Sequence, residues 1–275
     1  MTTTPLLMGV VNVTPDSFSD GGRWLESDAA TAHGRELLAE GADILDIGGE
    51  STRPGATRPL VAEELSRVVP VIRALAADGA VVSVDTMRAD VALAALEAGA
   101  TIVNDVSGGL ADDRMLAVVA DAGATYVAMH WRAHSDRMAD FAVYDGPGGV
   151  VQAVCDELAA RVDAMLAAGI APERIVLDPG LGFAKHGEQN WELLRGLDRL
   201  LALGHRVLVG ASRKSFLGRL LADADGTPRP VLDREAANIA LTAHLAHAGV
   251  WGIRVHDVRS SHDALRVVAR LEGKS

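Results

Sequence analysis

The sequence predicts one (β/α)8 barrel, the TIM-barrel fold, formed by residues 1–275 as a single domain. The length of 275 residues suits such a barrel, which typically takes roughly 250. Hydrophobic residues make up 49% of the chain but aromatic residues only 4%, so the core must be aliphatic, as it is where helices cover parallel strands. One unit also recurs: a segment rich in Ala and Leu ends at a glycine, and an apolar strand follows.

Eight strand-like segments can be followed along the chain. The first is Leu6–Asn12, and each of the other seven follows a glycine that suits the left-handed position closing a helix. These glycines are Gly41, Gly79, Gly99, Gly123, Gly169, Gly204 and Gly249. The polar residues expected where the eight strands end are Asn12, Asp46, Asp85, Asn104, His130, Asp178, Gly210–Lys214 and Arg254–His256. A doubly wound open sheet is the alternative fold, but the chain has no Gly-x-Gly-x-x-Gly fingerprint.

The segment Arg174–Lys185 indicates where a ligand binds. Ile175–Leu177 is a short apolar run, typical of a strand buried on both faces, and it ends on the carboxylate of Asp178. The sequence Pro-Gly-Leu-Gly then forms a loop whose backbone can approach a ligand closely. Asp178 could instead cap the next helix, but this insert delays that helix, which favours the ligand-binding role.

In a barrel of this kind the active site lies at the carboxyl ends of the strands. The polar strand ends should therefore meet at one rim, where acidic and amide groups lie beside cations. Two long loops rich in Gly, Pro, Ser and Thr, at about 14–25 and 48–59, belong to the same face. We expect them to be mobile active-site loops.

The composition excludes several classes of function. A formal net charge of −11 argues against a nucleic-acid-binding surface, which needs a basic stripe. An anionic ligand would need local cations that oppose the field of the whole chain. The single cysteine, Cys155, lies on the apolar face of an expected helix, so we expect it to be buried, without a disulfide within the chain. The first residues carry no positively charged region and no apolar run reaches ~18 residues, so we expect a cytoplasmic protein without membrane contact.

Seven motifs in register resemble those of the dihydropteroate synthase family. Met8–Asp20 closely resembles the opening motif of that family, and Asp46–Gly55 is similar to its second signature. The remaining motifs are Ser83–Thr86, Asn104–Gly109, Asp178–Lys185, Gly210–Lys214 and Arg254–His256. The resemblance runs from about Leu6 to His256, nearly the whole chain, and Met129–Arg132 resembles the actinobacterial branch in particular.

The resemblance implies a transferase of folate biosynthesis. The family joins 7,8-dihydropterin-6-ylmethyl diphosphate to 4-aminobenzoate, which gives 7,8-dihydropteroate and pyrophosphate. The residues it implies at the pterin and diphosphate are Asp85, Asn104, Met129, Asp178, Lys214, Arg254 and His256, of which Asp85, Lys214, Arg254 and His256 form the catalytic set. Asp178 suits its role because a carboxylate can accept from both a ring N–H and the exocyclic amine. Arg254 suits its role because a flat guanidinium can stack on the ring while it faces anions.

The resemblance also implies a metal and a second substrate site. It places Mg²⁺ between the diphosphate and Asn12, which is compatible with one amide ligand because Mg²⁺ keeps water and phosphate ligands. Asn12 could otherwise simply close the first strand. The residues implied at 4-aminobenzoate are Phe18, Thr52, Arg53, Pro54, Lys185 and Ser212. The amine of this substrate is neutral at pH 7, so we expect dissociative displacement of diphosphate without a general base. The family forms homodimers, which we expect here.

Other functions stay open at this point. An aldolase-like barrel with a Schiff base on Lys185 or Lys214 would need a buried lysine, and both follow polar turns that argue against burial. A pterin- or folate-binding methyltransferase barrel would lack the Ser-Thr-Arg-Pro loop and the Arg-Val-His ending, which are both present. A catalytically silent pterin-binding paralogue should have lost loop residues or Asn12, and they are retained. His130 and His134 would need a third ligand to bind zinc.

Overall fold

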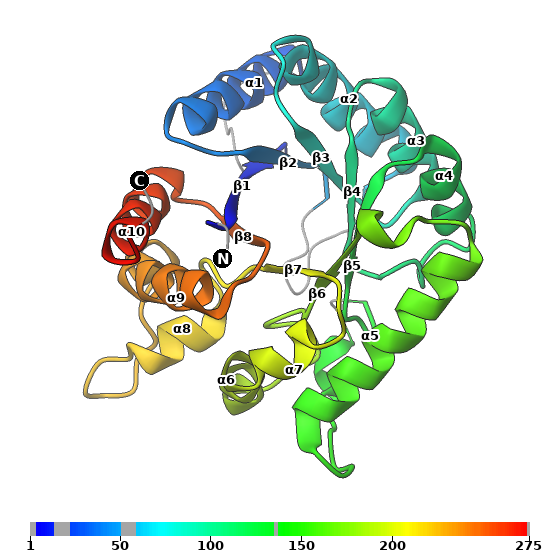
Figure 1. The fold of residues 1–275 in the computed structure, drawn as a ribbon. Coiled ribbons are helices and arrows are strands. Elements are labelled where there is room, and N and C mark those ends of the chain that lie inside the picture. Colours follow the sequence, from blue (N-terminus) through cyan, green and yellow to red (C-terminus); the bar gives the residue numbers. More distant parts are fainter. Residues whose placement is uncertain (1–3, 14–22, 51–58, 135–136, 274–275) are drawn as a thin grey trace.

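The computed structural model of the protein describes residues 4–13, 23–50, 59–134 and 137–273. Its eight strands are parallel and pair in chain order, and β1 also pairs with β8, so the sheet closes into a barrel (Figure 1). The strands are β1 Leu6–Asn12, β2 Ile44–Gly48, β3 Val82–Asp85, β4 Ile102–Asp105, β5 Thr125–Met129, β6 Ile175–Asp178, β7 Arg206–Val209 and β8 Gly252–Val255. The predicted (β/α)8 fold is confirmed.

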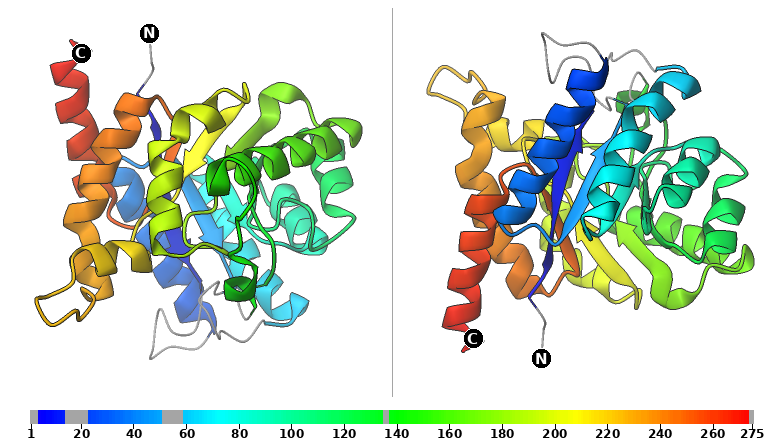
Figure 2. Two further views of the ribbon diagram at one scale, coloured as in Figure 1. Left: turned by 90° about the horizontal axis from the view of Figure 1, so that it is seen from below. Right: turned by 90° about the horizontal axis from the view of Figure 1, so that it is seen from above.

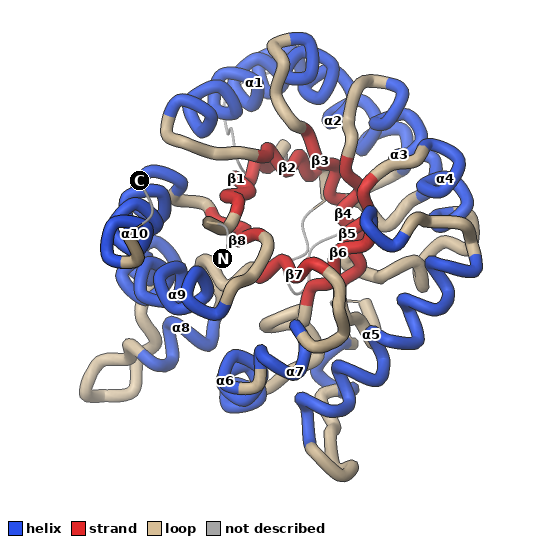
Figure 3. Tube along the Cα trace, viewed as in Figure 1, coloured by secondary structure: helices blue, strands red, loops and turns tan. Residues whose placement is uncertain are grey.

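Helices surround the barrel on its outside (Figure 3). They are α1 Arg23–Ala39, α2 Val61–Ala77, α3 Ala89–Glu97, α4 Met115–Ala122, α5 Gly149–Ala167, α6 Gly187–Arg195, α7 Leu197–Leu201, α8 Ser215–Leu220, α9 Glu235–Ala248 and α10 Val258–Leu271. Short 3-10 helices lie at Met138–Phe141, Pro172–Arg174 and Val231–Arg234. None of the helices in the described part of the chain is both long and apolar enough to cross a membrane.

The glycines predicted to close helices do so through their backbone conformation. All seven have a positive φ, between 60° and 112°. Gly123 and Gly249, for example, are the left-handed C-caps of α4 and α9. A residue with a Cβ would be strained there, which explains why glycine recurs before each strand.

Apolar side chains pack in two main regions. A large aliphatic cluster fills the space between the strands and the helices, and it includes Cys155, which is 5% exposed, as predicted. A smaller cluster fills the barrel interior and consists of Met8, Ile44, Ile102, Val127, Val176 and Leu208. Because successive side chains of each strand alternate between these regions, the strands read as nearly continuous apolar runs.

The same alternation places polar groups directly above the inner core. Residues two apart on a strand point to the same face. On the even-numbered strands, Ile44, Ile102 and Val176 pack in the inner cluster, and a Cβ on Gly252 would lie 3.0 Å from Leu208 of that cluster. The residues two positions further along these four strands are Asp46, Asn104, Asp178 and Arg254. They lie at the carboxyl ends of the strands, which together with the residues directly after them we call the barrel mouth.

Two strands continue past the residue predicted to end them. β2 continues to Gly48 and β4 continues to Asp105, so Asp46 and Asn104 lie inside their strands. Pairing with neighbouring strands extends both segments, whereas β8 ends at Val255, within the predicted Arg254–His256. The side chains of Asp46 and Asn104 nevertheless reach the barrel mouth, because their position in the alternation, and not the strand end, sets the direction.

Most of the two loops expected to be mobile lies outside the described residues, namely 14–22 and 51–58. α1 begins at Arg23, so residues 23–25 are helical and do not belong to the first loop. The start of β1 and the end of α10 lie on the side of the barrel opposite the mouth (Figure 2). The described segments that border the mouth are therefore the ones that follow strands.

A buried carboxylate holds the turn that follows β4. Asp105 points away from the barrel interior and accepts hydrogen bonds from Ser107 N and Oγ, both at 2.7 Å, and from Gly109 N at 2.9 Å. The hydroxyl of Tyr126 donates to the same carboxylate at 2.7 Å. Burial raises the pKa of Asp105, which these donors oppose. The motif Asn104–Gly109 thus combines one residue that faces the mouth with a turn built around Asp105.

Replacing Tyr126 with Phe should test this arrangement. The Tyr126→Phe variant leaves a buried carboxylate with one donor fewer, so the free energy of unfolding should fall by roughly 1–3 kcal/mol. Denaturant-induced unfolding measures the loss. A change below about 0.5 kcal/mol would mean that Asp105 does not depend on this hydroxyl.

Candidate active site

The guanidinium of Arg254 joins two carboxylates in the barrel mouth. Its Nε donates to Asp46 Oδ2 at 2.7 Å, and its Nη2 donates to Asp85 Oδ2 at 2.8 Å. The side chain of Asp46 is fully buried, whereas that of Arg254 is 23% exposed. Arg254 is therefore fixed from below by its partners and open to the mouth, which suits contact with a ligand.

The carboxylates around Arg254 have unequal electrostatic environments. Burial raises the pKa of Asp85 to about 7, although the charge of Arg254 opposes this. The neighbouring carboxylates Asp46, Glu64 and Asp105 add to the increase. Burial also works against the charge of Arg254, but Asp46 and Asp85 more than offset it and raise its pKa. Asp85 can therefore gain or lose a proton near neutral pH.

Asn104 and Asp178 complete the even-strand layer, which is the set of mouth-facing residues on the even-numbered strands: Asp46, Asn104, Asp178 and Arg254. Asn104 Nδ2 donates to Asp46 Oδ2 at 2.9 Å, so one acceptor fixes both Asn104 and Arg254. Asp178 Oδ1 accepts from Gly180 N at 2.7 Å, which holds the carboxylate against the loop that follows β6. Burial raises the pKa of Asp178, and the charge of Lys214 opposes it. An amide and a carboxylate thus sit in fixed orientations across the mouth.

Lys214 reaches into the mouth from the turn after β7. The preceding residue, Arg213, has a left-handed φ of 63°, which is unusual for a residue with a Cβ. Lys214 Nζ donates to Leu181 O and lies 4.9 Å from the centre of the Phe183 ring. Burial lowers the pKa of Lys214 to about 8, an effect that Asp178 opposes. Gly210 lies against both cations, because a Cβ on it would be 3.5 Å from Arg254 Cβ and 4.0 Å from Lys214 Nζ.

A small apolar cluster of its own forms part of the mouth. Met129 packs with Met87 and Val106, and Phe183 lies against them. This cluster is separate from the inner core of the barrel. An apolar surface beside Asp178 and Lys214 suits the face of a flat ring.

Two more predicted residues meet at the end of β8. The hydroxyl of Ser212 accepts from His256 N at 3.3 Å and lies 3.0 Å from His256 Nδ1. Ser212 is buried and His256 is partly exposed. The imidazole, two residues after Arg254 in the sequence, is therefore held by Ser212, which follows the neighbouring strand β7.

Asn12 suits a metal ion that takes most of its ligands from water and phosphate. Its side chain is exposed at the end of β1, and a Cβ on Gly48 would lie 3.9 Å from Asn12 Oδ1 and 3.8 Å from Asp85 Oδ2. The absence of that Cβ leaves the space between the two oxygens open. The described residues contain no group of three His, Cys, Asp or Glu side chains that could hold a metal alone. Hard oxygen donors with room for water and phosphate fit Mg²⁺.

Comparison with known proteins shows the family to which the chain belongs. Residues 8–256 match the family described as pterin binding enzyme. The dihydropteroate synthase of Mycobacterium leprae is 56% identical over 264 residues, which is 95% of this chain and 92% of that protein. The chain belongs to the dihydropteroate synthase family. This is a family of transferases, so the enzyme class expected from the resemblance is confirmed.

Solved structures of the family agree in fold. A Xanthomonas albilineans dihydropteroate synthase with 4-aminobenzoic acid has a TM-score of 0.89 at 44% identity, covering 99% of this chain and 94% of that one. A Yersinia pestis dihydropteroate synthase in complex with a sulfonamide drug has a TM-score of 0.88 at 37% identity, covering 98% and 95%. Both matches extend over the whole barrel.

The structure brings most of the predicted family residues together. The described ones that gather at the mouth are Asn12, Asp85, Asn104, Met129, Asp178, Ser212, Lys214, Arg254 and His256. Arg213 lies nearby but pairs with Glu235 of α9 at 3.3 Å, so its charge is partly balanced. Phe18, Thr52, Arg53 and Pro54 lie outside the described residues, and their roles stay predictions.

Lys185 is placed differently from what a direct contact with 4-aminobenzoate requires. Its side chain is buried, and Nζ has three protein acceptors: His130 Nδ1 at 2.9 Å, Gly180 O at 3.0 Å and Phe183 O at 2.9 Å. In this arrangement the ammonium has no N–H left for a substrate. The expectation that polar turns would keep both lysines from being buried was wrong for Lys185, whose side chain is buried under its own turn, whereas Lys214 is only partly buried. Family membership, and not lysine exposure, argues against the aldolase alternative.

Some residues that shape the site were missed from sequence. Asp46 was counted as a strand end, but its central position between Asn104 and Arg254 was not foreseen. Glu64 of α2 is fully buried. It accepts hydrogen bonds from Thr86 Oγ1 at 2.6 Å and from Arg88 Nη1 at 2.9 Å, and both donors lie in the segment that directly follows Asp85. A signal existed: Glu64 shares the apolar face of α2, at helical spacing.

The raised pKa of Asp85 predicts a pH-dependent stability. Between about pH 4 and pH 7 the folded state keeps a proton that the unfolded chain, with an ordinary value of 3.8, has lost. The free energy of unfolding therefore falls as pH rises through this window. Asp85→Asn removes the titration. The free energy of unfolding of the variant, relative to that of the wild type, should therefore increase by on the order of 1–4 kcal/mol between about pH 4 and pH 8.

Denaturant-induced unfolding at several pH values measures this gain. Asp90→Asn is a matched control, because Asp90 is an exposed carboxylate paired with Arg114. It should follow the wild type across the range. A constant difference between wild type and Asp85→Asn would contradict a raised pKa.

Proposed function

We propose that the barrel mouth condenses 7,8-dihydropterin-6-ylmethyl diphosphate with 4-aminobenzoate, releasing pyrophosphate and forming 7,8-dihydropteroate. The observation that carries this proposal is the pairing of two kinds of group in one mouth. Asp178 and Asn104 offer the acceptors and donors that a pterin edge needs, and Lys214 and Arg254 lie beside them as cations. The relatives named above support the same reaction.

The pterin is assigned to the even-strand layer. Asp178 accepts from a ring N–H and from the exocyclic amine, while the hydrogen bond from Gly180 keeps the carboxylate oriented. Asn104 adds an amide whose position is set by Asp46. Lys214 reaches the carbonyl side of the ring, and Met129 provides apolar contact with its face.

The diphosphate is assigned to the cations at the ends of β8 and β7. Negative charge grows on it as the C–O bond breaks, and we assign the stabilisation of that charge to Arg254 and His256, which Asp46 and Ser212 hold in position. Asn12 would contribute an amide oxygen to Mg²⁺, which when bound supplies positive charge to the diphosphate oxygens. Since Arg254 is already held by two carboxylates, it needs little rearrangement on binding.

The attack by 4-aminobenzoate needs no general base, because an aromatic amine is already neutral at pH 7. We assign a dissociative displacement in which the pterin methylene gains cationic character. Asp85, at the edge of the mouth, is placed to stabilise that cation. Phe18, Thr52, Arg53, Pro54 and Ser212 are proposed to form the 4-aminobenzoate site on the strength of the resemblance.

Two further proposals, on the oligomeric state and the location, come mainly from the resemblance. We propose a homodimer, to which α10 could contribute, because it exposes Val267 and Leu271. We also propose a cytoplasmic location. A catalytically silent paralogue is the alternative function, and retention of the mouth residues argues against it.

The proposed reaction is tested by following both products. Purified protein with the pterin diphosphate, 4-aminobenzoate and Mg²⁺ should release pyrophosphate and form 7,8-dihydropteroate in equal amounts. A sulfonamide resembles 4-aminobenzoate, so inhibition should be competitive with that substrate. Pterin binding without product would identify the silent paralogue, and noncompetitive inhibition would misplace the 4-aminobenzoate site.

Asp178→Asn tests the pterin assignment. The amide turns one acceptor into a donor that opposes the N–H groups of the pterin, so affinity should fall by roughly tenfold to a hundredfold. Calorimetry with a 7,8-dihydropterin measures the loss without turnover. Asp263→Asn, an exposed carboxylate on α10, should bind like the wild type. Equal affinity in the Asp178→Asn variant would refute the assignment.

A further inference from the structure

The ammonium of Lys185 holds the turn that carries the pterin side of the mouth. Nζ donates to the carbonyls of Gly180 and Phe183, which lie at the two ends of the Gly180–Phe183 turn. Phe183 N also donates to Gly180 O at 3.0 Å, which closes the turn. Lys185 itself follows Ala184, whose φ of 47° directs the chain back over the turn. The lysine thus binds the backbone around it and not the solvent.

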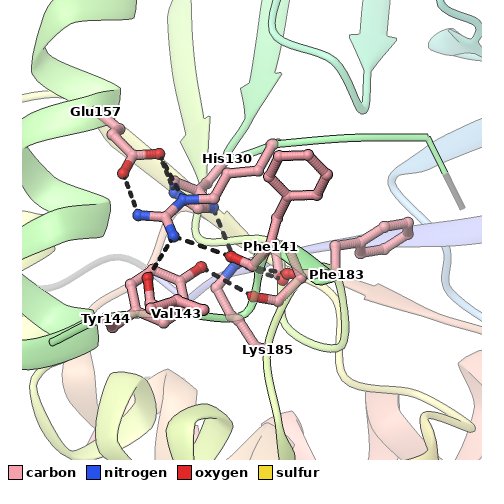
Figure 4. A network of polar contacts seen from close by, with 10 residues as sticks. His130, Phe141, Val143, Tyr144, Glu157, Phe183 and Lys185 are labelled. Atoms are coloured by element: carbon pink, nitrogen blue, oxygen red, sulfur yellow. Dashed lines mark hydrogen bonds and ion pairs between the residues drawn. The ribbon is translucent and has the colours of Figure 1, made fainter. Parts of the chain in front are cut away.

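The third acceptor of Lys185 is a histidine whose tautomer is fixed from its other side. His130 Nδ1 lies 2.9 Å from Lys185 Nζ, and His130 Nε2 lies 2.9 Å from Glu157 Oε2 (Figure 4). A carboxylate accepts only, so His130 must carry its proton on Nε2. Nδ1 is then an acceptor and requires a donor from Lys185. Burial and the charge of Lys185 lower the pKa of His130 to about 4, so the ring is neutral.

Glu157 is fixed by the loop that follows β5. Arg132 donates to Glu157 through Nε at 3.1 Å and through Nη2, and it also binds the carbonyls of Phe141 and Val143. Its guanidinium lies 4.0 Å above the Tyr144 ring, whose hydroxyl donates to Ala184 O at 2.9 Å. Burial works in the other direction, but hydrogen bonds from His130 and Arg132 lower the pKa of Glu157 to about 2. Glu157 is therefore a carboxylate at any ordinary pH.

The three acceptors around Lys185 Nζ match the three N–H bonds of an ammonium. A neutral amine has two N–H bonds and would leave one acceptor without a donor. The charged and titratable groups near Lys185 are His130 and Arg132 after β5, Tyr144 of the same loop, Glu157 of α5, Asp178 of β6, His186 next in the chain and Lys214 after β7. Burial and the charge of Lys214 lower the pKa of Lys185 to about 7, while Asp178 and Glu157 oppose this. The charge state of Lys185 is therefore finely balanced.

The turn held by Lys185 contacts two proposed pterin ligands. Gly180 N donates to Asp178 Oδ1, while Gly180 O accepts from Lys185. Leu181 O accepts from Lys214, and the Phe183 ring lies beneath its ammonium. Movement of the turn would therefore displace Asp178 and Lys214 together.

We propose that Lys185 is a positioning residue for the pterin site, and that His130 and Glu157 keep it charged so that the Gly180–Phe183 turn presents Asp178 and Lys214. Only the identity of the ligand rests on the proposed function. The relay of contacts from Glu157 through His130 to Lys185 does not depend on which ligand binds. Glu157 binds His130, which in turn binds Lys185, so Glu157 acts on Lys185 through this hydrogen bond and through its own negative charge.

The charge of Lys185 can be followed directly, because the whole sequence contains three lysines, Lys185, Lys214 and Lys274. Protein labelled with carbon-13 at lysine Cε gives one NMR signal for each, assigned with Lys185→Arg and Lys214→Arg. Glu157→Gln should move the titration midpoint of Lys185 to lower pH. Loosening of the fold would instead move it up toward the ordinary value of 10.5. The direction of the shift therefore separates the relay from a structural defect.

Two more variants complete this test. Asp156→Asn removes the same charge from the next position of α5, where Asp156 binds Gln152, and should leave the Lys185 midpoint unchanged. Arg132→Gln removes a cation that opposes the charge of Lys185, so it should move the midpoint to higher pH. Equal midpoints in wild type and Glu157→Gln, or an upward shift in Glu157→Gln, would overturn the relay.

The positioning role is tested by affinity for a 7,8-dihydropterin that lacks the diphosphate. Apparent affinity falls with the charged fraction of Lys185, so Glu157→Gln should bind up to about tenfold more weakly than wild type at pH 8 and within about twofold at pH 6. Asp156→Asn should match the wild type at both. A shifted midpoint with unchanged affinity at pH 8 would overturn the positioning role. If no variant and no wild type bound the pterin, the proposed function would fail, while the NMR result would still decide the relay.

Discussion

An arginine can be held inside a barrel only if anions surround it, and the mouth of this barrel is arranged around Arg254. Its partners, Asp46 and Asp85, come from strands at the opposite end of the sequence, and the barrel closure of β8 on β1 brings them together. Asp46 also fixes Asn104, so one buried carboxylate determines the geometry of two ligand-binding groups. This explains why a site for an anionic substrate contains so many carboxylates: they hold the cations in position before a ligand arrives.

Lys214 in the mouth and Lys185 beneath the turn after β6 follow the same backbone conformation. Ala184 and Arg213 are the non-glycine residues with positive φ in the described part of the chain, and each directly precedes one of these lysines. Such a conformation costs on the order of 1–3 kcal/mol and persists only where the surroundings impose it. Here it turns Lys185 and Lys214 back toward the loop after β6, so that both bind its carbonyls. The strain is offset by hydrogen bonds that a freely extended lysine would not make.

Sequence predicts this fold well because its signals are local and repeated. Glycine before each strand and two-residue alternation along it suffice to place Asp178 and Asn104 at the mouth. What it could not predict depends on contacts across space. Glu157 lies 27 residues beyond His130, and no periodicity links them. The burial of Lys185 was missed because a turn of polar composition folds its carbonyls inward, and composition does not reveal the direction of a carbonyl.

The choice between lysine and arginine follows the same physics. The chain has 26 basic residues and three of them are lysines, yet one of the three lies in the mouth and another holds the turn beside it. Arginine keeps its charge when buried, which suits Arg254, whereas a buried lysine shifts its pKa toward neutrality. Burial lowers the pKa of Lys185 to about 7 and that of Lys214 to about 8, and it raises the pKa of Asp85 to about 7. An anion that enters this mouth raises each of these pKa values, so its binding near neutral pH must draw protons from solution. In a protein with a net charge of −11, this proton uptake makes the mouth more positive when an anion occupies it.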